Sequence, residues 1–177
     1  MIGDHKLPDV LHVGMDLVFV GTAAGKRSAS VGEYYAYRGN RFWNALADVG
    51  LTKRIYSSSE FRDLAQLGIG FTDIVKSAAG MDHHAEVAEA LRAAPAEFVD
   101  KMKLFKPKAI AFTSKRAASV FLSRRTGLIS YGKLRPSIPD FPEIFVLPSS
   151  SGAARLYWTI EPWRDVADWH AAQGCRS

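Results

Sequence analysis

The segment Leu17-Val18-Phe19-Val20-Gly21-Thr22-Ala23-Ala24-Gly25 begins with four consecutive apolar residues and continues with small ones. An apolar run without alternation is typical of a strand that is buried on both faces of a sheet. The small residues after Val20 predict a turn where a ligand can approach the backbone closely. The segment therefore predicts a buried parallel sheet with a ligand-accessible turn at the carboxyl end of one strand.

Strand-like and helical patterns alternate along the rest of the chain. Further strands are predicted at 69–75, 109–112 and 144–147, and helices at 42–47, 57–67, 87–91, 98–105, from Ser114 and from Pro162, with a turn-rich segment at 127–142. This alternation predicts an α/β fold, a three-layer α/β/α sandwich around a central, mainly parallel sheet. We expect residues 1–177 to form a single domain, because a chain of this length fits one core and shows no repeat or linker.

The composition limits the class of protein. Lys and Arg number 23 against 18 Asp and Glu, and the resulting charge of +5 permits a polyanionic partner without requiring one. Cys175 is the only cysteine, which excludes a disulfide framework and a thiolate metal cluster. No apolar run reaches the roughly 18 residues of a membrane span, and the first residues lack a signal-peptide pattern. We therefore expect a cytoplasmic protein with no membrane partner.

An aromatic loop, residues 32–43, precedes one of the predicted helices. It reads Gly-Glu-Tyr-Tyr-Ala-Tyr-Arg-Gly-Asn-Arg-Phe-Trp. Exposed aromatic rings on a loop can hold a flat base taken out of a nucleic-acid stack. The alternative is that Tyr34, Tyr35 and Tyr37 pack on the neighbouring helix as ordinary half-buried residues.

Three polar segments follow predicted strands: 21–30, Thr72-Asp73 and 149–155. Ligands of parallel α/β sheets bind beyond the carboxyl ends of the strands. If the sheet is parallel, these segments meet at one edge, and their convergence predicts a functional site there.

Two other motifs are weaker. Residues 21–28 resemble a phosphate-binding P-loop, but only three residues separate the glycines and Arg27 intervenes before Ser28, which argues against a nucleoside triphosphatase. His83 and His84 are adjacent, and no third ligand follows at metal-like spacing. We expect no metal and no cofactor.

Several blocks in a fixed order resemble the uracil-DNA glycosylase superfamily. They are Gly21-x-x-x-Gly25 with Ser28, Tyr35 five residues before Asn40-Arg41-Phe42-Trp43, and the segments 68–75, 105–109 and 147–155. The mismatch-specific uracil/thymine branch has G-I-N-P-G, N-R-F-W and N-P-S-G at the first, second and last blocks. The hypoxanthine-DNA glycosylase branch has Y-Y-A-H-P-R-N-x-F-W, which is close to residues 34–43. The resemblance implies the α/β fold of that superfamily and DNA as the partner.

The sequence departs from the superfamily at its first motif. Ala23 stands where the mismatch-specific branch has its water-activating Asn, and Thr22 stands where another branch has Glu. The proline of that motif is Ala24, and the Asn that opens the last motif is Ser149. Either another residue performs catalysis, or the protein binds DNA damage without cutting.

The resemblance implies roles for individual residues around an extruded base. Tyr35 matches the aromatic residue that stacks on the base, and Thr22, Ala23 and Ser149 would line its site. Asn40 matches the catalytic or water-orienting residue of the hypoxanthine branch, although an Asn there also suits a helix N-cap. Asp73 is the nearest carboxylate and could accept a proton or position water, or could simply be an ion-paired acid at a strand end.

Other residues would contact the DNA. Ser28, Ser149 and Ser151 suit phosphate contacts, although serines in turns are also local caps. The segment from Gly152 to Arg155 matches the loop that fills the space left by the extruded nucleotide, with Arg155 as the inserted side chain. Lys115 could touch phosphate or be an ordinary surface lysine, and nothing supports Lys26 as a Schiff-base nucleophile.

These residues together predict a monofunctional uracil-DNA glycosylase that extrudes uracil or other deaminated bases and leaves an abasic site. We expect it to act as a monomer on single- or double-stranded DNA. The alternative is a non-catalytic or slow-turnover protein of the same fold that binds damaged or abasic DNA. An RNA- or nucleotide-processing α/β enzyme is a third hypothesis, based on fold analogy alone.

Overall fold

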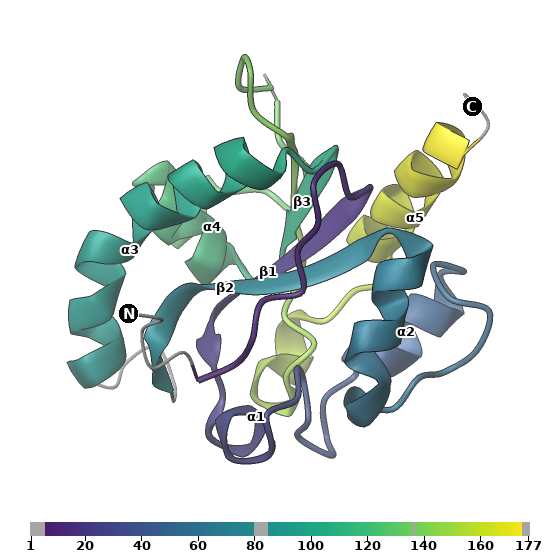
Figure 1. The fold of residues 1–177 in the computed structure, drawn as a ribbon, viewed down its shortest axis with the longest axis horizontal. Coiled ribbons are helices and arrows are strands. Elements are labelled where there is room, and N and C mark those ends of the chain that lie inside the picture. Colours follow the sequence, from purple (N-terminus) through teal and green to yellow (C-terminus); the bar gives the residue numbers. More distant parts are fainter. Residues whose placement is uncertain (1–5, 80–84, 136, 175–177) are drawn as a thin grey trace.

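The computed structural model describes residues 6–79, 85–135 and 137–174 (Figure 1). These residues form a five-stranded sheet in the order β2-β1-β3-β5-β4. The strands are β1 (Leu17–Ala24), β2 (Ile69–Ala79), β3 (Ala109–Phe112), β4 (Gly132–Lys133) and β5 (Glu143–Val146). β2, β1, β3 and β5 are parallel, and only β4 pairs antiparallel, with β5. The predicted mainly parallel sheet is confirmed.

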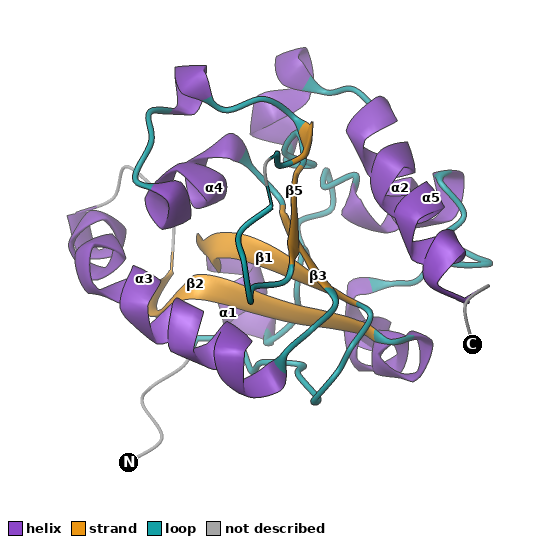
Figure 2. Cartoon of the chain, turned by 90° about the horizontal axis from the view of Figure 1, so that it is seen from above, coloured by secondary structure: helices purple, strands orange, loops and turns teal. Residues whose placement is uncertain are grey.

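Helices cover both faces of this sheet. The α-helices are α1 (Lys26–Val31), α2 (Phe42–Asp48), α3 (Ala85–Phe105), α4 (Lys115–Leu122) and α5 (Glu161–Gly174), and the 3-10 helices are η1 (Ser58–Leu67), η2 (Thr126–Leu128) and η3 (Gly152–Tyr157). Figure 2 shows α3 and α4 on one side of the sheet and α2 and α5 on the other. The three-layer α/β/α arrangement is therefore also confirmed. No helix in the described part of the chain is long and apolar enough to cross a membrane.

The apolar run of β1 is continuous because both faces of the strand are covered. Leu17 and Phe19 pack into the cluster that contains the buried residues of α2 and α5. Val18 and Val20 alternate with them and pack into the second cluster, with residues of α3 and α4. Because successive side chains of a strand point to opposite faces, apolar residues at four consecutive positions supply both clusters.

The prediction of a turn at residues 21–25 is wrong for residues 21–24. β1 continues to Ala24, and its parallel pairing with β2 joins Gly21 to Asp73 and Ala23 to Val75. Thr72 and Asp73 accordingly lie within β2 and not beyond it. The residues after Val20 are small because of tertiary contacts: a Cβ on Gly21 would collide with the Asp73 carboxylate.

Two helix predictions also need correction. The patterns at 87–91 and 98–105 belong to one helix, α3, which runs through Pro95. Phe98 and Met102 of α3 are fully buried, and such packing outweighs the backbone hydrogen bond that a proline cannot donate. The segment after Ser57 has the predicted capping box with Glu60 but forms a 3-10 helix.

Candidate active site

The carboxyl ends of the parallel strands meet at one edge of the sheet, as the sequence predicts. Thr113 follows β3 directly, and both its backbone N–H and its hydroxyl donate to the carbonyl of Val20 in β1, at 2.9 and 3.3 Å. Leu147, just after β5, donates its N–H to the carbonyl of Phe112 at 2.9 Å. The residues directly after β3 and β5 are thus held against the neighbouring strands β1 and β3.

Tyr35 connects the aromatic loop to this edge. Its ring is half-buried and stacks on Phe42, with the ring centroids 3.8 Å apart and the planes 11° from parallel. Its hydroxyl donates to Oγ1 of Thr113 at 3.2 Å. The backbone of Tyr35 has a φ of 52°, a left-handed conformation that costs a non-glycine residue about 1–2 kcal/mol. Strain of this kind is kept where the surrounding structure fixes one side-chain position.

The other two tyrosines of the loop differ from Tyr35 in exposure. Tyr34 is 2% exposed and packs on Phe61 and Phe71, whereas the Tyr37 side chain is 64% exposed. The packed alternative therefore describes Tyr34 and one face of Tyr35, and it does not describe Tyr37. Burial raises the pKa of both Tyr34 and Tyr35, and the charge of Asp73 raises them further. Both hydroxyls therefore stay protonated at neutral pH.

Asp73 is the buried carboxyl at this edge. Its side chain is held against Gly21, and the Tyr35 hydroxyl lies 3.9 Å from the position that a Cβ on Gly21 would take. Burial raises the pKa of Asp73 to about 6, Lys76 opposes that rise, and Asp9 adds to it. A carboxyl with a pKa near 6 can accept or release a proton close to neutral pH.

A partly buried ion cluster lies beside Asp73, and sequence patterns did not reveal it. Asp9 contacts Nζ of Lys76 at 2.8 Å and Nζ of Lys101 at 2.7 Å, and it accepts the Thr72 hydroxyl at 2.7 Å. Lys76 also donates to the Tyr34 hydroxyl at 3.0 Å. Burial alone would raise the pKa of Asp9, but the two lysines outweigh it and lower that pKa overall. The lysines therefore bring positive charge close to Asp73.

The cluster forms because the chain segment before β1 is held against β2. Val10 and Phe71 exchange two backbone hydrogen bonds, at 2.9 and 3.0 Å, in an isolated antiparallel bridge. This bridge places Asp9 over β2. The one local sign of this placement in the sequence is an acid, Asp9, next to Val10 of the bridge. No local pattern links Asp9 to lysines that lie more than sixty residues away in the sequence.

Asn40 lies at the start of α2. Its side-chain oxygen accepts the backbone N–H of Phe42 at 3.0 Å, an Asx turn that leads into the helix, whose N-cap residue is Arg41. The bond uses the oxygen of the amide, so the NH2 group is the part of the side chain that can serve a substrate. The catalytic role of Asn40 stays a prediction.

The remaining candidates on β1 and α1 are mostly enclosed. Thr22 is buried and Ala23 is half-buried within β1. Ser28 is buried in α1, and its hydroxyl accepts the backbone N–H of Ala36 at 3.1 Å. Through this hydrogen bond Ser28 holds the aromatic loop, which also carries Tyr35.

The serines of the segment after β5 make local contacts. Ser149 Oγ accepts the N–H of Ser151 at 3.3 Å, and Ser151 Oγ accepts the N–H of Ala153 at 3.4 Å, where it caps η3. Lys115 lies across the sheet at the start of α4, with Nζ 4.4 Å from the centre of the Tyr131 ring. These contacts fit the alternatives, in which the serines cap local turns and Lys115 is an ordinary surface lysine. Their roles in phosphate contact stay predictions.

The closing loop, residues 150–157, lies directly beside the aromatic loop. Arg41 donates its backbone N–H to the carbonyl of Ser150 at 2.9 Å, and a Cβ on Gly152 would lie 3.4 Å from the carbonyl of Gly39. Arg155 is exposed, as predicted. Leu156 is 86% and Tyr157 72% exposed, and the sequence analysis missed both. The signal that could have found them is an apolar pair directly after the last matched block.

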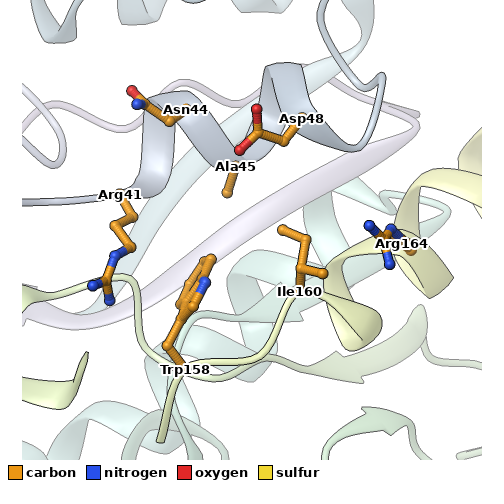
Figure 3. A pocket seen from close by; sticks show the side chains of 7 residues that line it. All are labelled: Arg41, Asn44, Ala45, Asp48, Trp158, Ile160 and Arg164. Atoms are coloured by element: carbon orange, nitrogen blue, oxygen red, sulfur yellow. The ribbon is translucent and has the colours of Figure 1, made fainter. Parts of the chain in front are cut away.

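A pocket of about 500 Å³ lies away from the sheet edge, between α2 and the segment before and within α5 (Figure 3). Its lining comprises Arg41, Asn44, Ala45, Asp48, Trp158, Ile160 and Arg164. None of the predicted catalytic residues lines it. Arg41 directly follows the predicted catalytic residue Asn40 in sequence, and it links the pocket to the aromatic loop.

Metal ligands do not gather in the part of the chain that the structure describes: no three His, Cys, Asp or Glu side chains there could hold an ion. His83, His84 and Cys175 lie outside the described residues. The sheet edge thus offers a carboxyl, two hydroxyls and an aromatic ring for chemistry.

The family model described as the uracil DNA glycosylase superfamily matches residues 8–172. The chain belongs to the uracil DNA glycosylase superfamily. It is also similar to the solution NMR structure of a protein from Methanosarcina acetivorans described as a "putative Uracil DNA glycosylase", with a TM-score of 0.60 and 21% identity over 93% of this chain and 96% of that one. At this identity the likeness shows the fold. Membership of the uracil DNA glycosylase superfamily supports a glycosylase-type enzyme that acts on DNA.

Proposed function

We propose that this member of the uracil DNA glycosylase superfamily hydrolyses the N-glycosidic bond of uracil in DNA and leaves an abasic site. The observation that carries the proposal is the placement of the Asp73 carboxyl, with a pKa of about 6, beside the Tyr35 hydroxyl at the carboxyl edge of the sheet. The first motif lacks its usual Asn and Glu, and Asp73 is the buried acid at the same edge.

In this mechanism Asp73 acts as the general base. Above pH 6 its carboxylate accepts a proton from a water molecule, and the water oxygen forms a bond to C1′ of the sugar. The bond between C1′ and the base nitrogen breaks, and its electron pair leaves with the base. The base then carries negative charge, which donors aimed at its oxygen stabilise. Asn40 would offer its amide NH2 as such a donor, because the Tyr35 hydroxyl already donates to Thr113 and the Thr113 hydroxyl to Val20.

The extruded base needs a surface on which to rest. One face of the Tyr35 ring is covered by Phe42, so the base would stack on the part of the ring that remains exposed. Stacking of a base on an aromatic side chain is worth about 1–3 kcal/mol. Extrusion from a duplex costs a few kcal/mol, and the exposed side chains of Arg155 and Leu156 would fill the space that the base leaves.

A base-release assay tests the proposal. Single- and double-stranded oligonucleotides that contain uracil, hypoxanthine or xanthine are incubated with the protein and then treated with alkali, which cuts the strand at abasic sites. We expect cleavage of the uracil substrates by the wild-type protein and at least a hundredfold slower release by Asp73→Asn. Absence of cleavage on every substrate would refute a glycosylase.

A second candidate function is a protein that binds abasic or damaged sites without turnover. The specific observation in its favour is Ala23, which replaces the water-activating Asn of the first motif. Saturable binding to abasic DNA, together with no base release at any pH, would favour this candidate over the enzyme.

A further inference from the structure

The pocket between α2 and α5 has a distinct distribution of charge. Figure 3 shows Arg41 and Arg164 at its two ends, with Asp48 on α2 facing Trp158 and Ile160 across the space. Arg164 is paired with Glu161, Nη1 to Oε1 at 3.3 Å, so the positive charge that a ligand meets lies at the Arg41 end. A ligand that suits this lining carries negative charge at that end, an apolar or planar body, and polar groups on the side of Asp48.

Arg41 lacks an acceptor. Its Nη1 atom is fully buried and has no hydrogen-bond partner among the described residues, and its guanidinium carbon lies 5.6 Å from the centre of the Trp158 ring. A buried donor without an acceptor is costly, and more so when it carries charge. A phosphate at this end of the pocket would supply an acceptor for the guanidinium group, whose fork of donors it matches in geometry.

The pocket adjoins both loops of the candidate site. Arg41 follows Asn40 directly, and its backbone N–H is bonded to Ser150 in the closing loop. On the proposed function, a DNA strand with one nucleotide at the sheet edge would cross these two loops. A neighbouring nucleotide of that strand would then lie within reach of the pocket.

We propose that this pocket binds a nucleoside phosphate, with the phosphate on Arg41 and the base between α2 and the side chains of Trp158 and Ile160. The polar edge of the base then faces Asp48. Guanine is the base that fits best, because its adjacent N1–H and N2–H groups are two donors for one carboxylate. The source is either a nucleotide of bound DNA, in which case the inference rests on the proposed function, or a free nucleotide.

Binding is measured without any base release, by calorimetry and by NMR line shifts. The probes are dGMP, dAMP, deoxyguanosine and inorganic phosphate. We expect dGMP to saturate the protein, with deoxyguanosine and phosphate each at least tenfold weaker and dAMP at least threefold weaker. Phosphate that binds as tightly as dGMP, or dGMP that does not saturate at millimolar concentration, would overturn the proposal.

Variants assign the binding to the pocket. Arg41→Gln should weaken the binding of dGMP at least tenfold, and Arg164→Gln should weaken it less. Asp48→Asn should remove the preference for dGMP over dAMP. The control is Arg124→Gln, an exposed arginine that follows α4 on the other face of the sheet, and it should bind dGMP as the wild type does. Equal losses in Arg41→Gln and Arg124→Gln would show that only net charge matters. Unchanged binding in Arg164→Gln and Asp48→Asn would place the ligand elsewhere.

The source of the nucleotide is decided by competition. A single-stranded oligonucleotide that contains guanine and no uracil is added to the protein saturated with dGMP. Displacement of dGMP, with weaker oligonucleotide binding in Arg41→Gln, assigns the pocket to bound DNA. Simultaneous binding of both assigns it to a free nucleotide. Because neither readout needs turnover, an inactive glycosylase leaves this inference intact, and an active one does not establish it.

Discussion

Asp73 carries a carboxyl group into a region where water has little access. Its folded-state pKa of about 6 lies above the ordinary 3.8 because burial disfavours the charged form, while the two lysines held by Asp9 keep the rise from being larger. For an acid whose pKa is raised on folding, the folded state is favoured at low pH, where the group is protonated in both states. That advantage is lost as the pH rises from about 4 through 6.

Asp73→Asn should therefore stabilise the protein above pH 6. We expect a gain of about 1–3 kcal/mol in the free energy of unfolding at pH 8 and a smaller change at pH 4.5, because the buried charge is absent from the variant. Urea unfolding of both proteins at the two pH values measures this. A variant that is less stable than wild type by the same amount at both pH values would contradict a buried ionised Asp73.

The two roles of Asn40 can be separated by a pair of substitutions. Asn40→Ala removes the acceptor for the Phe42 N–H and should cost about 1 kcal/mol of stability. Asn40→Asp keeps that acceptor and should retain wild-type stability, but it lacks the NH2 group and should lose most of the base-release rate. Full activity in Asn40→Asp would show that Asn40 only holds the start of α2, through its bond to Phe42, and takes no part in catalysis.

At the scale of elements, residue 21 of β1 must be small because the side chain of Asp73 in β2 occupies the space beside it. A Cβ at Gly21 would collide with the buried Asp73 carboxylate. A Cβ at Gly25 meets nothing within 4 Å, and its φ of −65° suits any residue. The two glycines at the ends of the first motif therefore have different reasons to be small.

Gly21→Ala should destabilise the protein by about 1–3 kcal/mol, the usual cost of an overpacked core, and Gly25→Ala should change stability by less than about 0.5 kcal/mol. The double variant Gly21→Ala with Asp73→Ala should recover part of the loss because the collision is gone. Thermal or urea unfolding measures all of them. Equal effects at positions 21 and 25 would contradict the packing argument.

Arg155 and Leu156 are exposed side chains of the closing loop, beside the aromatic loop. Arg155→Ala and Leu156→Ala should each weaken binding to duplex DNA with a uracil mismatch by about 1 kcal/mol or more, if these side chains fill the space left by the base as proposed. Single-stranded substrates should be affected less. Fluorescence anisotropy with both DNA forms measures this, and equal losses on the two forms would remove the role in extrusion.

At the scale of the whole molecule, Asp9 joins three segments. It pairs with Lys76 of β2 and Lys101 of α3 from the chain before β1. The lysines lower the pKa of Asp9 overall, against the effect of burial, so the stability it contributes is present above pH 3.8 and is lost as the pH falls through the lowered folded value.

Asp9→Asn should cost about 2–4 kcal/mol at pH 7, because two partly buried lysines lose their counter-charge. The difference from wild type should shrink below pH 3.8. Asp16→Asn is the matched control: its partner Lys108 is 51% exposed, and such surface pairs are worth less than about 1 kcal/mol. Urea unfolding at pH 7 and pH 3 measures both. Equal costs for the two variants would show that burial of the Asp9 cluster does not matter.

The sequence alone determined the elements whose signals are local. The apolar run at 109–112 predicted β3 with its observed bounds, and Ser114 was identified as the start of α4, where its hydroxyl accepts the Ala117 N–H. The alternation of strands and helices was enough for the α/β class. The ordered blocks were enough for the superfamily, because they lie at fixed intervals along the chain.

Only the tertiary structure decided the state of the site. The pKa of Asp73, the strained backbone of Tyr35 and the bond from Tyr35 to Thr113 depend on residues that are distant in sequence. The same holds for the Asp9 cluster and for the pocket beside Arg41. Periodicity and capping are properties of neighbouring residues, whereas desolvation and ion pairing depend on which atoms the folded chain brings within a few ångströms of one another.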